Sequence, residues 1–247
     1  MKVLVIDVGG THVKILASGQ TDVRRMDSGP ALTAEQMADG VKKLAKGWAY
    51  DAVAIGYPGV VVRDRPVTEP HNLGPGWVAF DYHAAFGCPV KVINDAAMQA
   101  LGSFKHGKLL FLGLGTGLGS TLVVNGSVVP MELAHLPYRD GTFEDYVGER
   151  ALERDGKKQW RKRVADVVAR LAAALVPDEV VIGGGNVRLL KTLPPNCRAG
   201  DNANAFVGGF RLWESATPAA KPRQAATAQR KAAAKRAPAR RKASKAA

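Results

Sequence analysis

A chain of 247 residues, 46% of them hydrophobic, is long enough to bury a core and has the composition of a globular protein. It has no apolar run of about eighteen residues and no secretory leader pattern at its N-terminus, so we expect a cytoplasmic protein without a membrane span. Cys88 and Cys197 are too few for a disulfide framework or a multi-cysteine zinc site.

The net charge of +13 is concentrated near the C-terminus. Residues 216–247 contain ten Lys or Arg and no acidic residue, whereas residues 1–215 carry 25 basic and 22 acidic side chains. The segment 216–247 also lacks large apolar side chains, so we expect a disordered basic tail. Such a tail binds polyanions with little sequence selectivity, or else serves only as a solubilising extension.

The first half of the chain predicts strands and helices in alternation. The runs KVLVIDV and VKILAS indicate two strands, and the glycines of Gly9–His12 between them indicate a hairpin turn. Thr33 and Gln36 have the spacing of a capping box, which predicts the start of a helix. A strand over 52–59 and a hairpin through VVVRDRPV follow.

Two polar residues then stand at a junction between a strand and a helix. The strand VKVIND ends at Asn94 and Asp95, and both are good N-caps for a helix that continues through Leu101. A carboxylate at the end of a strand, facing a cleft, can also accept the proton of a hydroxyl that attacks phosphorus. Asp95 alone therefore has two interpretations, a helix cap and a general base.

The second half repeats this opening. LLFLGLG predicts a strand, Gly113–Gly119 a glycine loop, and STLVVNGSVVP a hairpin that turns at Asn125 and Gly126. Apolar residues at helical spacing from Trp160 to Leu175 predict a helix. EVVIGGG predicts a strand that ends in glycines, after which Asn186 is expected to cap another helix.

A unit of strand, glycine turn and strand thus occurs twice, near residues 3–17 and near residues 109–124. Neither turn is a P-loop, because no Gly-Lys-Ser/Thr follows, and both lead into strands, whereas the dinucleotide fingerprint opens a helix. Free backbone N–H groups in such turns can still bind phosphate. The repetition predicts a duplicated α/β architecture with a cleft between its halves.

Seven short motifs follow one another along the chain. They are D-x-G-G-T-x-x-K at Asp7–Lys14, Y-P-G-V-V from Tyr57, N-L-x-x-G-W at Asn72–Trp77, N-D-A at Asn94, G-T-G-x-G at Gly115–Gly119, E-x-x-H at Glu132–His135 and G-G-G at Gly183–Gly185. Together they resemble the ROK (repressor–ORF–kinase) family of bacterial sugar kinases over residues 1 to about 212. The short body and the Y-P-G-V-V run are most similar to the polyphosphate glucokinase branch.

This resemblance implies an actin/hexokinase-like (RNase H-like) duplicated fold. The expected domains are an N-terminal one over 1–104, a C-terminal one over 105–215 and the disordered basic tail over 216–247. The implied activity is that of a phosphotransferase of the glucokinase or polyphosphate glucokinase type, which converts glucose to glucose 6-phosphate with Mg²⁺ and polyphosphate or ATP. The family resemblance also implies a homodimer.

The resemblance assigns a role to each motif. Asp95 is the implied general base, and the implied sugar ligands are Asn72, Asn94, Glu132 and His135, together with Glu144 by a looser alignment. The implied donor-phosphate ligands are Asp7, Gly9, Gly10, Thr11, Lys14, Gly115, Thr116 and Gly117. Asp7 is expected to position Mg²⁺ through water. Gly183, Gly184 and Gly185 match the nucleotide-binding turn of relatives that use ATP, or form a tight strand-to-helix connection.

Two positions depart from the family pattern. The zinc-binding cysteines that usually follow the E-x-G-H histidine are absent from HLPYRDGTFEDYVGER, so we expect no structural zinc. The loop that bears Glu144 is then expected to be held by packing. Ala134 also replaces the glycine of E-x-G-H.

Two questions stay open at this point. Polyphosphate as the donor is favoured by the basic segment Lys157–Arg163 and by the tail, whereas ATP is favoured by Gly183–Gly185. The alternative to an enzyme is a non-catalytic sugar sensor whose basic tail binds nucleic acid. The presence of Asp7, Asp95 and both glycine turns favours the enzyme.

Overall fold

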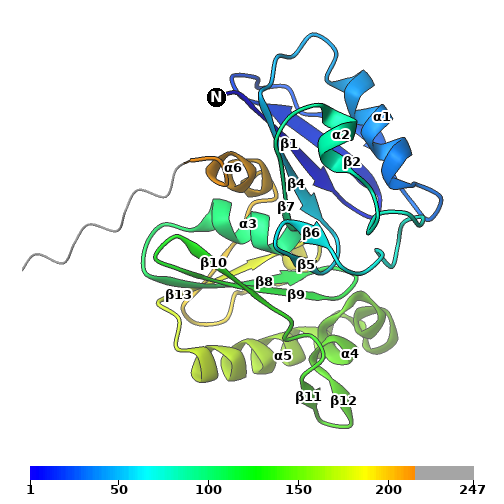
Figure 1. The fold of residues 1–247 in the computed structure, drawn as a ribbon. Helices are drawn as coiled ribbons and strands as arrows, with labels where there is room; N and C mark the ends of the chain where they lie inside the picture. Colours follow the sequence, from blue (N-terminus) through cyan, green and yellow to red (C-terminus); the bar gives the residue numbers. More distant parts are fainter. Residues whose placement is uncertain (215–247) are drawn as a thin grey trace, which may run out of the picture. The chain divides into compact units, whose positions relative to one another are not determined.

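Two five-stranded mixed sheets with the same strand order form the framework of residues 1–214, the part of the chain that the computed structural model describes (Figure 1). The predicted basic tail over 216–247 lies outside the described residues. Residues 1–214 form one compact unit. The domain boundary predicted near residue 104 stays a prediction. None of the helices within this unit is both long enough and apolar enough to span a membrane.

The first sheet has the order β3-β2-β1-β4-β7. Its strands are β1 (Val3–Val8), β2 (His12–Ala17), β3 (Arg24–Asp27), β4 (Ala52–Tyr57) and β7 (Val90–Asn94). β1 is antiparallel to β2 and parallel to β4, and β4 is parallel to β7. The hairpin β1–β2 is the predicted one, and its connection, Gly9–Thr11, is called the first glycine turn below.

The second sheet, β10-β9-β8-β13-β14, repeats that order. Its strands are β8 (Lys108–Leu114), β9 (Leu118–Val124), β10 (Ser127–Met131), β13 (Glu179–Gly183) and β14 (Cys197–Ala199). In both sheets the third, second and first strands are antiparallel neighbours, and the first, fourth and fifth are parallel neighbours. The duplication predicted from the two hairpins is therefore present, and Gly115–Gly117 forms the second glycine turn.

Helices and two small hairpins complete the described residues. The helices are α1 (Ala34–Leu44), α2 (Tyr82–Phe86), α3 (Asp95–Ser103), α4 (Phe143–Val147), α5 (Glu149–Leu175), α6 (Asn204–Arg211) and the single 3₁₀ turn η1 (Val187–Leu189). The hairpins are β5 (Val61–Val62) with β6 (Arg65–Pro66), and β11 (Pro137–Tyr138) with β12 (Gly141–Thr142). The capping box of Thr33 and Gln36 opens α1 as predicted.

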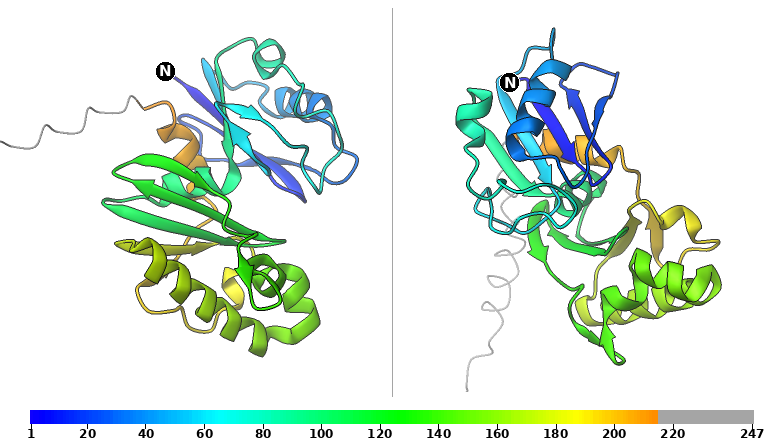
Figure 2. Two further views of the ribbon diagram at one scale, coloured as in Figure 1. Left: turned by 60° about the horizontal axis from the view of Figure 1, so that its bottom comes forward. Right: turned by 90° about the vertical axis from the view of Figure 1, so that its right-hand side faces the viewer.

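Each sheet buries one face against its own helix. Met37 and Val41 of α1 belong to the core that contains Leu4 and Ile6 of the first sheet. Trp160 of α5 belongs to a separate core with strands of the second sheet, and Figure 2 shows α5 running along one face of that sheet. Burial of these large apolar side chains is the main stabilising term for both layers.

Helix α3 lies between the two sheets (Figure 1). Its Met98 packs in a core with Val5 of the first sheet, whereas Ala100 packs in a core with Phe111 of the second sheet. The C-terminal helix α6 returns to this point and crosses α3 so closely that a β-carbon on Gly208 would collide with the carbonyl of Met98. The start of α3, where Asp95 lies, is thereby fixed from both sides.

Two expectations about helices are corrected. Asn186 does not cap a helix with its side chain, because only the single turn η1 follows. Instead, Nδ2 of Asn186 donates to the Gly115 carbonyl at 3.3 Å. The helix predicted to include Lys157 and to run to Leu175 begins earlier, at Glu149, and is interrupted at Gly156, whose φ of +73° lies in the left-handed region that glycine adopts without strain.

Candidate active site

The two glycine turns and the start of α3 line one cavity of about 310 Å³, called the central cavity below. It is lined by Gly9, Gly10, Pro58, Asn72, Asp95, Ala96, Gln99, Phe111, Gly113, Gly115, Thr116, Gly117, Leu118, Gly119, Glu144 and Gly184. These residues come from segments far apart in the chain. The first glycine turn follows β1, the second follows β8 and Asp95 follows β7, so strands of both sheets end at this cavity.

The first glycine turn is a tight connection. The Gly9 N–H donates to the His12 carbonyl at 3.0 Å, and the Ser28 hydroxyl donates to the Gly9 carbonyl at 2.6 Å. A second bond, from the Ser28 N–H to the Thr11 carbonyl at 2.9 Å, holds the other side of the turn. The shape of the turn is therefore set before any ligand binds.

Asp7 precedes this turn on β1, directly opposite Lys14 on β2. Burial raises the pKa of Asp7, and the positive charge of Lys14 acts in the opposite direction. A partly buried carboxylate beside a lysine is suited to binding a cation or the cation of a phosphate complex.

The second glycine turn is held by the segments that follow it. The Gly115 N–H donates to the Gly117 carbonyl at 3.1 Å, and the Glu149 N–H, at the start of α5, donates to the Thr116 carbonyl at 3.1 Å. The Leu118 N–H donates to Oε2 of Glu144 at 3.1 Å. The glutamate that sequence similarity aligned only loosely is thus in direct contact with this turn.

Asp95 is the first residue of α3, and the residue that caps the helix is its neighbour. Oδ1 of Asn94 accepts the Ala97 N–H at 3.1 Å, and Nδ2 of Asn94 donates to the Gly59 carbonyl at 3.1 Å. The Asp95 carboxylate accepts the Ala96 N–H at 2.7 Å and lines the central cavity. Of its two interpretations, the cap therefore belongs to Asn94.

The pKa of Asp95 is raised to about 7. Burial is the larger cause, and the negative charge of Asp7 adds to it, because both disfavour the ionised carboxylate. A carboxylate that titrates near neutral pH can accept a proton in the reaction and release it afterwards.

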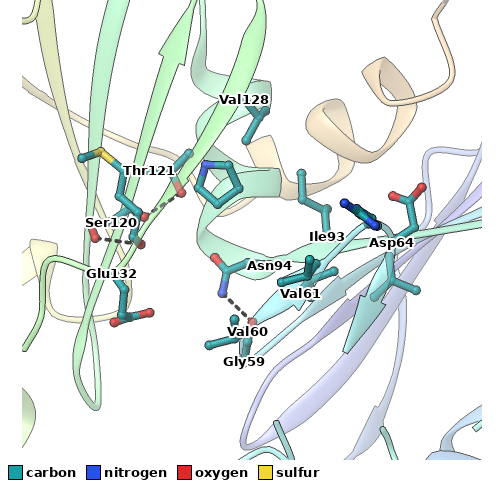
Figure 3. Close-up of a pocket in the computed structure, with 16 residues that line it drawn as sticks. Gly59, Val60, Val61, Asp64, Ile93, Asn94, Ser120, Thr121, Val128 and Glu132 are labelled. Carbon is teal, nitrogen blue, oxygen red and sulfur yellow. Dashed lines mark hydrogen bonds between the residues drawn. The ribbon is translucent and has the colours of Figure 1, made fainter. Parts of the chain in front are cut away.

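The expected sugar ligands fall into two groups. Asn72, Asp95 and Glu144 line the central cavity. Asn94 and Glu132 line a neighbouring cavity of about 530 Å³, which shares Gly119 with the first and is called the side cavity (Figure 3).

His135 belongs to neither group. It is absent from the linings of both cavities, and its Nε2 lies 3.9 Å from Oε1 of Glu132. Both side chains are more than half exposed, at 69% for His135 and 59% for Glu132.

Gly183 ends β13, and the two glycines that follow it differ in their surroundings. A third cavity, of about 680 Å³, is lined by Gly184 and Gly185 and shares Gly115, Thr116 and Gly184 with the central cavity. Gly184 has a φ of +82°, and a β-carbon there would collide with Leu114, so this glycine is required by the connection itself. Gly185 has open space beside it.

Gln99 lines the central cavity although the sequence analysis gave it no role. It follows Asp95 by four residues on α3, and this spacing puts the two side chains on one face of a helix. That spacing is the signal that could have identified it.

No group of three or more His, Cys, Asp or Glu side chains within residues 1–214 could hold a metal ion. Mg²⁺ is commonly bound by one or two carboxylates, retained waters and substrate phosphates. Asp7 and Asp95 fit that kind of site, because the charge of Asp7 disfavours ionisation of Asp95 and a cation would relieve this repulsion.

The fold is that of a known sugar kinase structure. The inorganic polyphosphate/ATP-glucomannokinase from Arthrobacter sp. strain KM matches with a TM-score of 0.71 at 24% identity, over 84% of this chain and 96% of that one. The model of the ROK family matches residues 3–130, which is more than half of the chain. The chain therefore belongs to the ROK family.

Curated relatives carry several different names, among them the following two. The polyphosphate glucokinase of Mycobacterium tuberculosis (strain CDC 1551 / Oshkosh) is 26% identical over 203 residues, which cover 73% of this chain and 76% of that protein. The N-acetylmannosamine kinase of Vibrio vulnificus (strain CMCP6) is 25% identical over 175 residues, which cover 63% of this chain and 56% of that protein. The family therefore includes relatives that are named for different sugars.

Proposed function

We propose that this chain is a hexose kinase that converts glucose to glucose 6-phosphate, with polyphosphate or ATP as the phosphoryl donor. The observation that carries the proposal is the position of Asp95, whose pKa near 7 suits a base and which shares one cavity with both glycine turns. The polyphosphate glucokinase relatives support the choice of glucose and polyphosphate.

In the proposed reaction, a hydroxyl oxygen of the sugar attacks the terminal phosphorus of the donor. The bond between that phosphorus and the leaving phosphate oxygen breaks, and the hydroxyl proton passes to the Asp95 carboxylate. Because the transition state of phosphoryl transfer is loose, the base mainly orients the hydroxyl and takes the proton late.

Sugar hydroxyls need partners that both donate and accept, and the cavities supply amides and carboxylates. We assign Asn72 and Glu144 to this role in the central cavity, and Asn94 and Glu132 from the side cavity. Asn94 uses one amide hydrogen on Gly59 and one lone pair on Ala97, so one of each is left for a ligand. His135, which is exposed, stays a proposed ligand on resemblance alone.

The donor phosphates are assigned to the two glycine turns and to Lys14. Backbone N–H groups of these turns bind anions without a change of structure, since hydrogen bonds already fix both turns. When bound, Mg²⁺ would be held by Asp7 and the donor phosphates and would neutralise part of their charge.

We propose that polyphosphate or ATP serves as the phosphoryl donor. Exposed Lys157, Lys158 and Lys162 on α5 support a polyanionic donor. The open space at Gly185 leaves room for the rest of a nucleotide in the third cavity. We also retain as proposals the two domains with a cleft, a cytoplasmic location, a homodimer and the disordered basic tail.

The non-catalytic sugar sensor stays the second candidate, and its nucleic-acid contact falls on residues 216–247, outside the described part of the chain. A sensor would not need a cavity carboxylate whose pKa lies near 7, which supports the enzyme.

The proposal is tested by mixing purified full-length protein with Mg²⁺ and glucose, mannose or N-acetylmannosamine. Polyphosphate and ATP are supplied in parallel reactions, and sugar 6-phosphate is measured. Turnover of glucose with at least one donor is the expected result. Turnover only of another sugar would overturn the glucose assignment, and no turnover with any pair would favour the sensor.

A further inference from the structure

The short helix α4 brings Glu144 to the central cavity. The Glu144 N–H donates to the Ala134 carbonyl at 3.0 Å, and its carboxylate accepts the Leu118 N–H at 3.1 Å. Because α4 is only five residues long, a small movement of the whole helix would displace this carboxylate from the second glycine turn.

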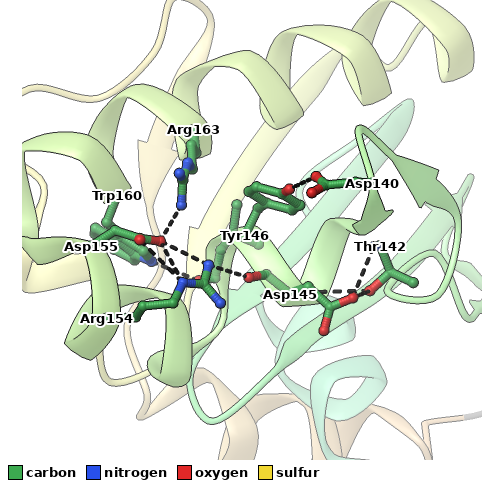
Figure 4. Close-up of polar contacts among 9 residues, drawn as sticks. Asp140, Thr142, Asp145, Tyr146, Arg154, Asp155, Trp160 and Arg163 are labelled. Atoms are coloured by element: carbon green, nitrogen blue, oxygen red, sulfur yellow. Dashed lines mark hydrogen bonds and ion pairs between the residues drawn. The ribbon is translucent and has the colours of Figure 1, made fainter.

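The N-terminus of α4 is capped by side chains of its own first residues. Thr142 and Asp145 form a capping box, in which the Thr142 N–H donates to Oδ2 of Asp145 at 2.9 Å. The Tyr146 hydroxyl donates to Asp140 in the β11–β12 hairpin (Figure 4). These contacts link α4 to the loop before it.

The end of α4 depends on donors from α5. The last carbonyls of a helix lack partners within the helix. Here Nε1 of Trp160 donates to the Val147 carbonyl at 2.7 Å, and Nη2 of Arg154 donates to the Asp145 carbonyl at 3.0 Å. The Trp160 contact is buried, whereas the Arg154 side chain is 54% exposed.

The direction of the Arg154 guanidinium is set by Asp155 (Figure 4). Nε and Nη2 of Arg154 both bond the Asp155 carboxylate, at 2.8–3.1 Å. Asp155 also pairs with Arg163, whose side chain is only 14% exposed and lies over the Tyr146 ring at 4.8 Å. A planar guanidinium held on two nitrogens has little freedom left, so its bond to α4 costs little further entropy.

We infer that Arg154 is a positioning residue for Glu144: by bonding the carbonyl of the neighbouring Asp145, it fixes α4 and with it the carboxylate at the second glycine turn. The inference rests on the proposed function, in which Glu144 binds the sugar. It assigns a positioning role to a side chain that lines none of the three cavities assigned to the substrates.

The kinetic test compares Arg154→Gln, Arg154→Lys, Glu144→Ala and the double variant Arg154→Gln/Glu144→Ala. Arg154→Gln is expected to raise KM for the sugar about three- to tenfold, with kcat and KM for the donor within about twofold. Arg154→Lys keeps one charged donor, so its KM for the sugar is expected to lie between the values of wild type and Arg154→Gln. In the Glu144→Ala background, Arg154→Gln is expected to add little, because residues that act through one contact are not additive.

The matched control is Arg170→Gln. Arg170 is also an exposed arginine of α5, and it pairs with Asp166 at 3.2 Å. Exposed pairs of this kind contribute little to stability, so both arginine variants are expected to unfold at nearly the wild-type temperature. Only Arg154→Gln is expected to change KM for the sugar.

Hydrogen exchange separates this inference from the proposed function. Arg154→Gln is expected to exchange several-fold faster than wild type and Arg170→Gln at residues 143–148 and at Leu118. Unchanged exchange there, an unchanged KM for the sugar, or full additivity with Glu144→Ala would each overturn the positioning role. If the wild type phosphorylates no hexose, the proposed function fails, and the exchange rates alone still decide whether Arg154 fixes α4.

Discussion

Gly117 and Glu144 lie so close that a β-carbon on the glycine would collide with Oε2 of the glutamate. The same oxygen accepts the Leu118 N–H at 3.1 Å. The second glycine turn and the carboxylate of α4 therefore fix one another. A side chain at 117 would therefore displace either the turn or the Glu144 carboxylate, although the φ of Gly117 is not in the left-handed region.

Gly117→Ala is expected to displace either the turn or the Glu144 carboxylate. In the proposed function, displacement of Glu144 raises KM for the sugar by about tenfold or more, and displacement of the turn raises KM for the donor instead. Steady-state kinetics measures the effect. A structural comparison is given by Gly115→Ala, for which no atom lies within 4 Å, and which is expected to unfold at the wild-type temperature. A Gly117→Ala enzyme with wild-type KM values for both the sugar and the donor would contradict the contact.

Asp95 is expected to lower stability as pH rises. In the unfolded chain its pKa is near 3.8, and in the folded chain it is about 7. Between these values the folded state holds the extra proton, so the free energy of unfolding falls with increasing pH across this window and stays lower above pH 7. Asp95→Asn should therefore be more stable than wild type at pH 8, by on the order of 4 kcal/mol, and equal to it near pH 3. Denaturant unfolding at the two pH values, without Mg²⁺, measures this difference, and equal stability at pH 8 would show that the carboxyl is not destabilised.

Gln99→Glu places a further carboxylate in the central cavity. A like charge near Asp95 raises its pKa, so the acidic limb of the pH–rate profile is expected to move to higher pH. KM for the donor should also rise, because phosphates are repelled. Gln99→Met, which keeps the size without the charge, should leave the midpoint of the limb in place. A profile of Gln99→Glu that coincides with wild type would exclude an electrostatic link between residue 99 and Asp95.

The crossing of α3 and α6 tolerates no side chain at its centre. Gly208→Ala is expected to cost about 2–4 kcal/mol in the free energy of unfolding, since its β-carbon would collide with the backbone of Met98. Val207→Ala, on the same helix at a position that is 39% exposed, should change stability by only about 0.5 kcal/mol. Thermal unfolding of both variants tests the contact, and similar unfolding temperatures would contradict it.

The hairpins with glycine turns were predictable because runs of apolar, β-branched residues flank them on both sides. The hairpin β11–β12 and helix α4 gave no such signal, since each is too short to show a period. The prediction that Asn186 caps a helix was wrong, because the turn after β13 leads only into η1. The Asn186 side-chain amide donates to the carbonyl of the distant Gly115 instead.

Only the site residues that belong to recognisable sequence motifs were predictable. The structure brings Asn72, Asp95 and Glu144 to one cavity, and their roles stay predictions. The loop of Glu144 was expected to be held by packing alone, yet the bonds from Arg154 and Trp160 also hold it. Neither partner could be read from the sequence, because such bonds depend on how α4 and α5 meet.

Asp95 is the proposed base of a hexose kinase, and the turnover of Asp95→Asn tests this role directly. With saturating glucose, Mg²⁺ and each donor, kcat is expected to fall about 10²- to 10⁴-fold relative to wild type, in protein that unfolds as cooperatively as wild type. A folded Asp95→Asn variant that retains kcat within about threefold of wild type would contradict the account.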